Sequence, residues 1–219
     1  MRKIGAVTIG QSPRKDVTKD ILPLLKDIEI VECGALDNYT YEEVVEKFQP
    51  TNNNIFVSIM RDGMQVSLDK DKLIIELNNC IKILENRGCE IIMVFCTGKI
   101  NNLESNVTLL QPNLIMKKII PEIALNTKIA IVVPDVKQIK YIKKQWDHTG
   151  LDITFFASSP YDSVKNIKHL SQKIKNQGFG LVYLDCIGYS KKMQEIVSQT
   201  TSLPVLLPRT ILAEVASLI

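Results

Sequence analysis

The clearest indication of the fold is the stretch EIIMVFCTGK (residues 90–99), in which a run of bulky apolar residues ends in a cysteine and a glycine follows two positions later. A short apolar run of this kind, preceded by an amphipathic segment at 71–87, is typical of a buried strand in a parallel sheet. The stretch GLVYLDCIGY (residues 180–189) has the same order of apolar run, cysteine and glycine. Together the two stretches predict an α/β protein.

Strand-like and helix-like segments alternate along the rest of the chain, as expected of a mainly parallel α/β fold. Eight segments have the composition of strands: 3–9, 29–33, 55–59, 90–95, 128–133, 152–157, 180–185 and 205–207. Seven segments have helical spacing of apolar residues: 13–26, 41–48, 71–87, 136–149, 163–177, 191–200 and 210–219. We expect the strands to form two small sheets rather than one.

The two halves repeat one order of elements, and a repeated unit sets the architecture. In each half a strand, a helix and a second strand lead to another helix, a third strand and then a cysteine, Cys96 or Cys186. We therefore expect a first α/β unit over residues 1–115 and a second over 116–205. The C-terminal segment 206–219 is expected to pack back on the first unit.

An inserted segment, roughly residues 37–70, distinguishes the first half from the second. It is expected to hold one helix and one strand. Its tail RDGMQVSL (61–68) contains an Asp-Gly pair, which indicates a hairpin at the sheet edge.

Composition excludes several classes of protein. The chain has 219 residues, no run of about 18 apolar residues and a net charge of only +3, so neither a membrane span nor a nucleic-acid-binding stripe is predicted. The apolar stretch 4–9 is too short for a signal peptide, which predicts a cytoplasmic protein. The five cysteines form no CxxC pair, so neither a disulfide framework nor a metal site is predicted.

Cys96 and Cys186 are the candidate reactive residues. Each directly follows a predicted strand, at the sheet edge where open α/β folds bind ligands. A thiol beside backbone N–H groups and the positive end of a helix dipole is expected to ionise more readily, so that it can act as a nucleophile or a base. The alternative interpretation is that both cysteines are only packed at strand ends.

Six strings occur in order along almost the whole chain: VTIGQSPRKD (7–16), ECGALD (32–37), RDGMQV (61–66), FCTGKI (95–100), SSPYD (158–162) and LDCIGYS (184–190). With them the chain resembles the AroM family within the aspartate/glutamate racemase superfamily. The resemblance implies two pseudosymmetric α/β domains with parallel sheets facing a central cleft. It also implies acid/base chemistry without pyridoxal phosphate or metal, with one thiolate removing an α-proton and the opposite thiol returning one. Cys96 and Cys186 match those two cysteines.

Such a reaction needs an acid and a base on opposite faces of one carbon, and donors for the charge that develops on the carboxylate. The candidate donors lie beside the two cysteines: Thr97, Gly98, Ile187, Gly188 and Tyr189. The chain differs from racemases of the superfamily in its strings Cys-Thr-Gly and Cys-Ile-Gly-Tyr, and no histidine flanks either cysteine.

The loop Gly10-Gln11-Ser12-Pro13-Arg14 is a second candidate for binding an anion. Ser followed by Pro predicts an N-cap and a first helical residue, and a helix start of this kind binds anions. Gln11, Ser12 and Arg14 are therefore expected to contact a carboxylate or phosphate. Alternatively, Ser12 only caps the helix and Arg14 lies on a solvated face. The loop lacks the pattern of a P-loop or GxGxxG motif, which argues against nucleotide binding.

Further candidate ligand residues follow other predicted strands. Arg61 and Asp62 are expected to contact the ligand, with a tight turn as the alternative. Ser158, Ser159 and Tyr161 occupy the place that matches Gly34 to Asp37 in the first half, although Ser-Pro is equally a helix-start signal.

The remaining distinctive side chains are predicted to have structural roles. His148 and His169 are expected on the surface, and Trp146 in the packing of a helix. Cys80 and Cys89 are expected to be core thiols, while Cys33 is the third choice for reactivity.

Two functions follow. The first is a cofactor-independent racemase or isomerase acting on a small carboxylate through Cys96 and Cys186. The alternative is a non-catalytic binding or sensing protein for a small anionic metabolite. The presence of both cysteines favours catalysis, whereas their altered neighbours favour another substrate or none. In either case the expected partner is a small anionic ligand, and the sequence leaves a homo-oligomer open.

Overall fold

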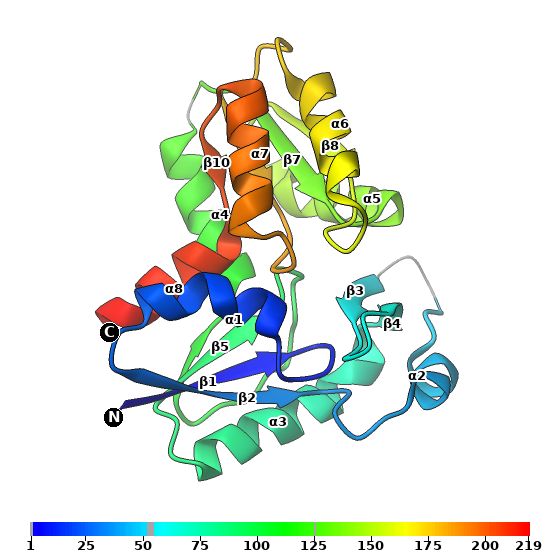
Figure 1. Cartoon of the computed structure of the whole chain (residues 1–219), viewed down its shortest axis with the longest axis vertical. Coiled ribbons are helices and arrows are strands. Elements are labelled where there is room, and N and C mark those ends of the chain that lie inside the picture. Colours follow the sequence, from blue (N-terminus) through cyan, green and yellow to red (C-terminus); the bar gives the residue numbers. More distant parts are fainter. Residues whose placement is uncertain (1, 52–54, 125) are drawn as a thin grey trace. The chain divides into compact units, whose positions relative to one another are not determined.

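The computed structural model describes residues 2–51, 55–124 and 126–219. Two compact units share the chain: residues 1–115 with 209–219, and residues 116–208. Each unit is built on its own four-stranded sheet, and both sheets are parallel throughout (Figure 1). The prediction of an α/β fold with two small parallel sheets is therefore confirmed.

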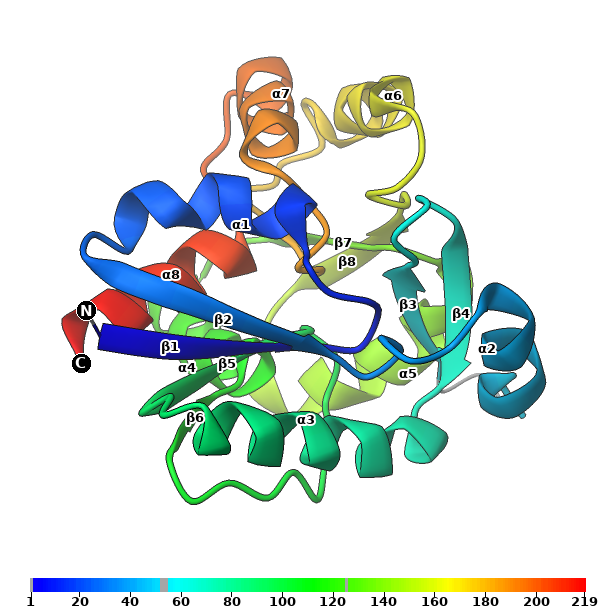
Figure 2. The same ribbon diagram turned by 60° about the horizontal axis from the view of Figure 1, so that its bottom comes forward.

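The sheet of the first unit has the strand order β2-β1-β5-β6. Its strands are β1 (Arg2–Thr8), β2 (Ile28–Gly34), β5 (Ile91–Phe95) and β6 (Thr108–Leu110). Figure 2 shows α1 (Lys15–Ile21) and α8 (Pro208–Leu218) on one face and α3 (Ile74–Asn86) on the other. Because helices cover both faces, β5 is buried along its whole length, which explains its unbroken apolar sequence.

The inserted segment forms a separate substructure of the first unit. It contains α2 (Tyr41–Phe48) and an antiparallel pair, β3 (Ile55–Ile59) and β4 (Gln65–Asp69). A capping box starts α2, since Thr40 and Glu43 each accept a hydrogen bond from the other's backbone N–H. The predicted hairpin is present, but it forms its own two-stranded sheet instead of extending the edge of the larger one.

The sheet of the second unit has the strand order β10-β9-β7-β8. Its strands are β7 (Ile129–Val133), β8 (Ile153–Ala157), β9 (Leu181–Leu184) and β10 (Val205–Leu206). Its helices are α5 (Val136–Trp146), α6 (Val164–Ile174), α7 (Lys191–Thr201) and most of α4 (Pro112–Ile123). Side chains of α6 and α7 pack on one face of the sheet, whereas Trp146 of α5 meets Tyr183 on the other.

The two sheets repeat one topology. In each, the first strand of the unit is central, the second lies beside it at one edge, and the third and fourth follow on the other side. A helix that begins with proline comes after the fourth strand in both cases, α4 in the first repeat and α8 in the second. Most of α4 belongs to the second unit and nearly all of α8 to the first, so each unit contains the last helix of the other repeat.

Several elements differ from the sequence prediction. The helix predicted over 13–26 is only α1, which ends where a 3-10 turn (Leu22–Leu24) with Pro23 near its start takes over. The prediction missed β6 and α4 altogether, and it included β4 only as the tail of a hairpin. β6 is only three residues long and α4 contains Pro121 within it, so both lack the usual length or composition signal.

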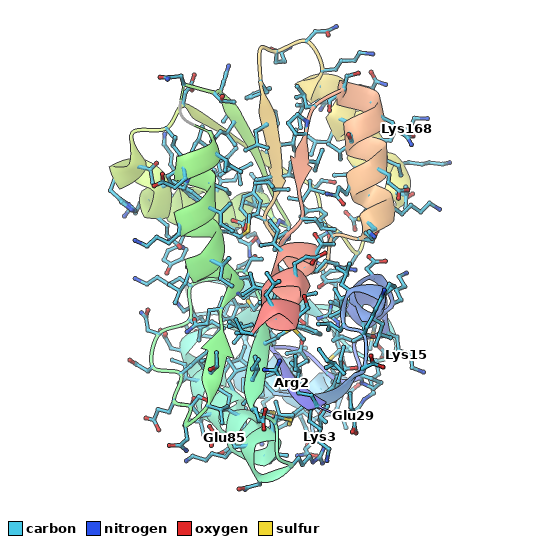
Figure 3. The ribbon with its side chains drawn as sticks, turned by 90° about the vertical axis from the view of Figure 1, so that its left-hand side faces the viewer. Arg2, Lys3, Lys15, Glu29, Glu85 and Lys168 are labelled. Atoms are coloured by element: carbon cyan, nitrogen blue, oxygen red, sulfur yellow. The ribbon has the colours of Figure 1, made fainter. Side chains whose placement is uncertain are left out.

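The amino-terminal edge of the first sheet is charged and open to solvent. Figure 3 shows Arg2, Lys3 and Glu29 at this edge, where β1 and β2 begin. The ion pair between Arg2 Nε and Glu90 Oε2 is long, at 3.8 Å, and the Glu90 side chain is 75% exposed. Such a pair adds little stability. By contrast, Thr8 at the carboxyl end of β1 is buried, as are Gln11 and Ser12 just beyond it.

Within residues 2–51, 55–124 and 126–219, no helix is both long and apolar enough to cross a membrane.

Candidate functional site

Cys96 and Cys186 occupy equivalent positions in the two repeats. In the first unit Thr8 lies opposite Phe95, the last residue of β5, and Cys96 comes next. In the second unit the Asp185 N–H donates to Val132 O at the end of β9, and Cys186 comes next. Cys96 therefore stands one residue beyond β5 and Cys186 two residues beyond β9, each at the carboxyl edge of its sheet. Both cysteines are 7% exposed.

Each thiol accepts a hydrogen bond from the glycine two residues later. Gly98 N–H donates to Cys96 Sγ over 3.4 Å, and Gly188 N–H donates to Cys186 Sγ over 3.3 Å. A backbone donor aimed at sulfur favours the thiolate over the thiol. The two Cys-x-Gly turns are thus built alike, and each is suited to hold a charged sulfur.

These turns replace the helix starts expected from the sequence. No helix occurs between Cys96 and β6, and α7 begins only at Lys191, after an N-cap by Ser190. The prediction that a helix dipole lies directly beside each thiol is therefore wrong. The glycine N–H supplies the local positive partner instead.

An aromatic ring covers each of these glycines. A Cβ at position 98 would lie 2.3 Å from Phe56 Cε1 in the hairpin of the first unit. A Cβ at position 188 would lie 2.8 Å from both Pro160 Cγ and Tyr161 Oη in the second. Glycine is therefore required at both positions by close approach.

Asp37 anchors three segments at the carboxyl edge of the first sheet. Its carboxylate accepts hydrogen bonds from Ser12 N and Ser12 Oγ, both over 2.6 Å, and from Gly34 N over 2.8 Å. Arg61 Nη2 lies 2.8 Å from Asp37 Oδ1. Asp37 lies within the string ECGALD but was not predicted as a site residue.

Gln11 and Arg61 complete this network. Gln11 Nε2 donates to Leu36 O and Tyr39 O over 3.1 and 2.9 Å, while its Oε1 accepts from Arg61 N over 2.9 Å. Arg61 Nε donates to Ser12 O over 2.6 Å. The Arg61 side chain remains 49% exposed, so its guanidinium braces the loops and also faces solvent.

Asp62 closes the hairpin turn, because its Oδ1 accepts a hydrogen bond from Met64 N over 2.9 Å. The next residue, Gly63, has a φ of 90°, a conformation that favours glycine. The structure thus matches the tight-turn interpretation of this segment.

Arg14 and Ser12 are not arranged as predicted. Arg14 itself precedes the first residue of α1 as the N-cap, without a side-chain cap, so the prediction of Ser12 as the N-cap is wrong. Ser12 is tied to Asp37 instead. Arg14 is only 2% exposed, which also excludes a solvated helix face. Its Nε and Nη2 donate to the two Asp16 carboxylate oxygens over 2.8 and 2.7 Å.

A second buried arginine joins this cluster from α8. Arg209 is 1% exposed, and its Nη1 donates to Asp16 O over 2.7 Å and to Asp20 Oδ2 over 2.8 Å. Burial raises the pKa of Asp16, but its hydrogen bonds with Arg14 and the charges of Arg14 and Arg209 outweigh that effect and leave the pKa below its ordinary value. Burial of Arg209 lowers the pKa of its own guanidinium.

In the second unit, the residues after β8 meet the residues after β9. Ser158 N donates to Val133 O at the end of β7, in the same way that Ala35 N donates to Thr8 O at the end of β1. Ser158 therefore corresponds to Ala35. The predicted correspondence of Ser158 to Gly34 is wrong by one position. Ser158 O accepts the Tyr189 hydroxyl, and Ser159 Oγ accepts Tyr161 N over 3.1 Å. The loop Ser158 to Tyr161 therefore packs on the Cys186 turn.

Cys186 has three neighbours of note: Tyr183, Tyr189 and the carboxylate of Asp185. Only Tyr189 was predicted as a site residue. Tyr183 Oη donates to Asp185 Oδ1 over 3.0 Å, and Tyr189 is completely buried. Burial raises the pKa of both tyrosines well above the usual value, and the nearby charges of Asp185 and Cys186 add to this. The alternation of Tyr183 and Asp185 on one strand face is a signal that could have found this pair.

The other distinctive residues have the structural roles predicted for them. His148 and His169 are exposed, Trp146 packs edge-on against Tyr183 at 6.4 Å, and Cys80 and Cys89 are buried. Among the residues that the structure describes, no group of three or more His, Cys, Asp or Glu side chains is arranged to hold a metal ion.

Comparisons with known proteins relate the whole chain to one family and one fold. The AroM protein family matches residues 4–219. A search of curated proteins gives no match. Solved structures with this fold include a maleate cis-trans isomerase from Nocardia farcinica bound to TRIS, which is 12% identical with a TM-score of 0.66 over 100% of this chain and 92% of that one.

Two racemases have the same fold. Allantoin racemase from Klebsiella pneumoniae is 11% identical, with a TM-score of 0.61 over 98% of this chain and 86% of that one. Glutamate racemase from Aquifex pyrophilus is 16% identical, with a TM-score of 0.59 over 99% of this chain and 84% of that one. At such identities the likeness shows the fold of the chain.

Proposed function

The chain belongs to the AroM protein family, and on that premise we propose that it is a cofactor-independent racemase or isomerase acting on a small carboxylate. The observation that carries this proposal is the pair of equivalent Cys-x-Gly turns, each with an N–H donated to sulfur. Cys96 and Cys186 are the proposed acid/base pair. One sulfur, as thiolate, takes a proton from the substrate carbon, and the other, as thiol, returns a proton to the opposite face.

Three of the structural neighbours support this class of reaction. They are an allantoin racemase, a glutamate racemase and a maleate cis-trans isomerase, and all three names denote isomerisation. Glutamate and maleate are both small carboxylates. Racemisation of a carboxylic acid at its α-carbon requires only proton removal and return, for which two thiols are chemically sufficient.

The groups that stabilise the sulfurs differ from the groups that stabilise charge on the substrate. The N–H groups of Gly98 and Gly188 hold the sulfurs, and in our proposal their role is to keep a thiolate stable before proton transfer. Charge developing on the substrate carboxylate needs other donors. We assign this task to Thr97 and Arg61 in the first unit and to the hydroxyls of Ser158, Ser159 and Tyr161 in the second.

The remaining predicted ligand residues receive supporting roles in this proposal. Gln11 and Ser12 hold Arg61 in place through the hydrogen bonds described above. Arg14 forms a two-point contact with Asp16. We therefore propose that Arg14 stabilises the loop that carries Gln11 and Ser12, and that Ile187 and Tyr189 shape the Cys186 turn.

Exchange of α-hydrogen for deuterium tests the proposal directly. The full chain is incubated in D₂O with a panel of amino, hydroxy and dicarboxylic acids, and deuterium is measured by mass spectrometry. We expect exchange with at least one acid, and a loss of turnover of roughly a thousandfold in Cys96→Ser and in Cys186→Ser. Cys89→Ser is the matched control, because Cys89 is buried outside the two turns, and it should keep full activity.

The same experiment distinguishes the alternative function. Acids that raise the melting temperature of the chain without any exchange would overturn the enzymatic proposal and favour a binding or sensing protein. Exchange from one face can survive in a single serine variant, because the other cysteine remains. Exchange that survives in the double variant Cys96→Ser/Cys186→Ser would show that another base acts, and would overturn the assignment of the two cysteines.

A further inference from the structure

A second pair of cysteines lies inside the first unit, away from the Cys-x-Gly turns. Cys33 is next to the last residue of β2, and Cys80 is in the middle of α3, which packs on the same sheet. Their sulfurs are 2.7 Å apart and share a hydrogen bond. The two residues are 47 positions apart in sequence, so the fold alone brings them together.

The surroundings favour reaction of these two thiols with each other. A disulfide needs its sulfurs at roughly 2.05 Å, and both cysteines are free in the structure. Cys33 is 9% and Cys80 5% exposed, so both thiols are largely shielded, and a small hydroperoxide reaches them more easily than a large thiol does. Because a strand and a helix hold them, neither sulfur has to travel far to bond to the other.

One thiol of the pair ionises more readily than the other. The shared hydrogen bond lowers the pKa of Cys33 more than burial raises it. The same hydrogen bond, together with burial, raises the pKa of Cys80. Cys33 is therefore the thiol that attacks an electrophile first.

We propose that Cys33 and Cys80 form an oxidative modification site, which a hydroperoxide converts reversibly into a disulfide. The Cys33 thiolate attacks one peroxide oxygen, the O–O bond breaks, and in the case of hydrogen peroxide a sulfenic acid and water result. The Cys80 sulfur then attacks the Cys33 sulfur, and the second oxygen leaves as water. Overall, two thiols and one hydrogen peroxide give one disulfide and two water molecules.

This site would act on the network around Asp37. The loop closed by the disulfide contains Asp37, α2 and the hairpin with Arg61. Gly34 directly follows Cys33 and donates its N–H to Asp37. The disulfide would thus tether the base of the Arg61 network to α3, and it does not depend on the function proposed for Cys96 and Cys186.

Peptide mapping of the full chain tests the proposal. The reduced protein is treated with a small excess of hydrogen peroxide, its free thiols are blocked with iodoacetamide in denaturant, and it is digested with trypsin. Cys33 falls in the peptide 27–47 and Cys80 in the peptide 73–82, and neither peptide contains another cysteine. We expect one linked product of these two peptides, two hydrogens lighter than their sum, which dithiothreitol separates again.

Three variants and three further outcomes make the result decisive. Cys33→Ser and Cys80→Ser should each abolish the linked product, so that one of them suffices if the other does not fold. Cys89→Ser, another buried cysteine of this unit, should leave it unchanged. Full alkylation of peptides 27–47 and 73–82 at a peroxide dose that oxidises free glutathione would overturn the proposal. Linkage of either peptide to 88–99, or irreversible sulfinic acid at Cys33, would also overturn it.

Discussion

The edges that carry Cys96 and Cys186 have the same topology and the same turn but different surroundings. The first unit has two ion pairs in the segments after β1 and β2, where Asp37 pairs with Arg61 and Arg14 is buried against Asp16. Around Cys186 the second unit places the hydroxyls of Ser159 and Tyr161 and two buried tyrosines. The insertion that contains Arg61 has no counterpart in the second repeat.

Comparing the two edges shows which features the Cys-x-Gly turn requires. In both units the glycine two residues after the cysteine donates to sulfur and lies under an aromatic ring, Phe56 or Tyr161. The Arg14–Asp16 and Asp37–Arg61 ion pairs belong to the first unit, whereas the carboxylate near Cys186 is that of Asp185, which accepts a tyrosine hydroxyl. The turn is thus determined by backbone geometry and close packing, while each unit adds its own polar groups around it.

The largest expected effect contrasts the two helices that follow the fourth strands. Arg209, second in α8, is 1% exposed and pairs with Asp20, whose side chain is 14% exposed. Asn113, second in α4, only donates to Thr97 O over 2.9 Å. We expect Arg209→Ala to lower the free energy of unfolding by roughly 3–5 kcal/mol, because it removes a buried guanidinium and leaves the half-buried Asp20 carboxylate without this arginine. Asn113→Ala should cost roughly 0.5–1.5 kcal/mol.

Urea unfolding followed by circular dichroism measures both values. Arg209→Ala combined with Asp20→Asn is the control, since it also removes the carboxylate charge and should recover part of the loss. If Arg209→Ala lowers the free energy of unfolding no more than Asn113→Ala does, the ion pair between Arg209 and Asp20 does not distinguish the attachment of α8 from that of α4.

The glycines of the two turns provide the next contrast. Gly98→Ala places a methyl group 2.3 Å from the buried Phe56 ring, whereas Gly188→Ala meets Pro160 and the hydroxyl end of Tyr161 at 2.8 Å. Overpacking typically costs about 1–3 kcal/mol. We expect Gly98→Ala near the upper end and Gly188→Ala near the lower, because the end of the Tyr161 side chain can move more easily than a ring in the core.

Denaturant unfolding checks this order, and Phe56→Leu in the Gly98→Ala background should restore part of the stability. Both alanine variants should also lower the reactivity of the neighbouring thiol toward iodoacetamide at neutral pH. An equal cost in the two units would mean that the rings do not control the turns.

The strands and the two cysteine positions were predictable from sequence because their signals are local. Apolar runs such as IIMVF indicate buried parallel strands wherever they occur, and the strand ends then place Cys96 and Cys186 at the sheet edge. The repeat could be found because both halves preserve the order of elements. The prediction missed β6, which has only three residues, and α4, which contains an internal proline.

The polar partners were not predictable because they depend on contacts between distant segments. Ser12 has the sequence context of an N-cap, yet Asp37, 25 residues later, takes its N–H and hydroxyl. Arg14 has the context of an exposed helix residue, yet Asp16 and the fold around α8 bury it. A carboxylate that neutralises a buried arginine looks like any surface carboxylate until the fold is known.

A smaller contrast appears at high pH, and it should affect the second unit. The folded-state pKa values of Tyr183 and Tyr189 lie well above the ordinary value of 10.0. A raised folded-state pKa contributes stability that is fully present below about pH 10 and is lost as the pH rises toward the folded-state value. We therefore expect the second unit to lose stability above about pH 10.

Fluorescence of Trp146 reports this loss, because it is the single tryptophan and packs edge-on against Tyr183. Tyr183→Phe should flatten the dependence of unfolding on pH above 10. Tyr39→Phe, in the first unit, should leave the Trp146 signal as in the unmodified chain. An unchanged slope in Tyr183→Phe would contradict the role given to that tyrosine.

The smallest effect is expected at low pH, and it should affect the first unit. The pKa of Asp16 lies below its ordinary 3.8, because its pairing with Arg14 and the charge of Arg209 outweigh the effect of burial. A lowered folded-state pKa contributes stability that is present above the ordinary value and is lost as the pH falls through the folded-state value. The Asp16 side chain is 39% exposed, so solvent screening keeps this contribution small.

The pKa of Glu32 is shifted in the opposite direction from that of Asp16, which makes the test specific. Burial raises its pKa above the ordinary 4.5, so protonation of Glu32 on acidification favours the folded state and offsets part of the loss from Asp16. Urea unfolding between pH 3 and 5 should therefore show a flatter acid-side decline in Asp16→Asn and a steeper one in Glu32→Gln. Trp146 fluorescence should stay unchanged over this range in both variants, because these two carboxylates belong to the first unit. A parallel shift of the Trp146 signal would mean that acid acts on both units together, and the contrast between their two edges would then not extend to their response to pH.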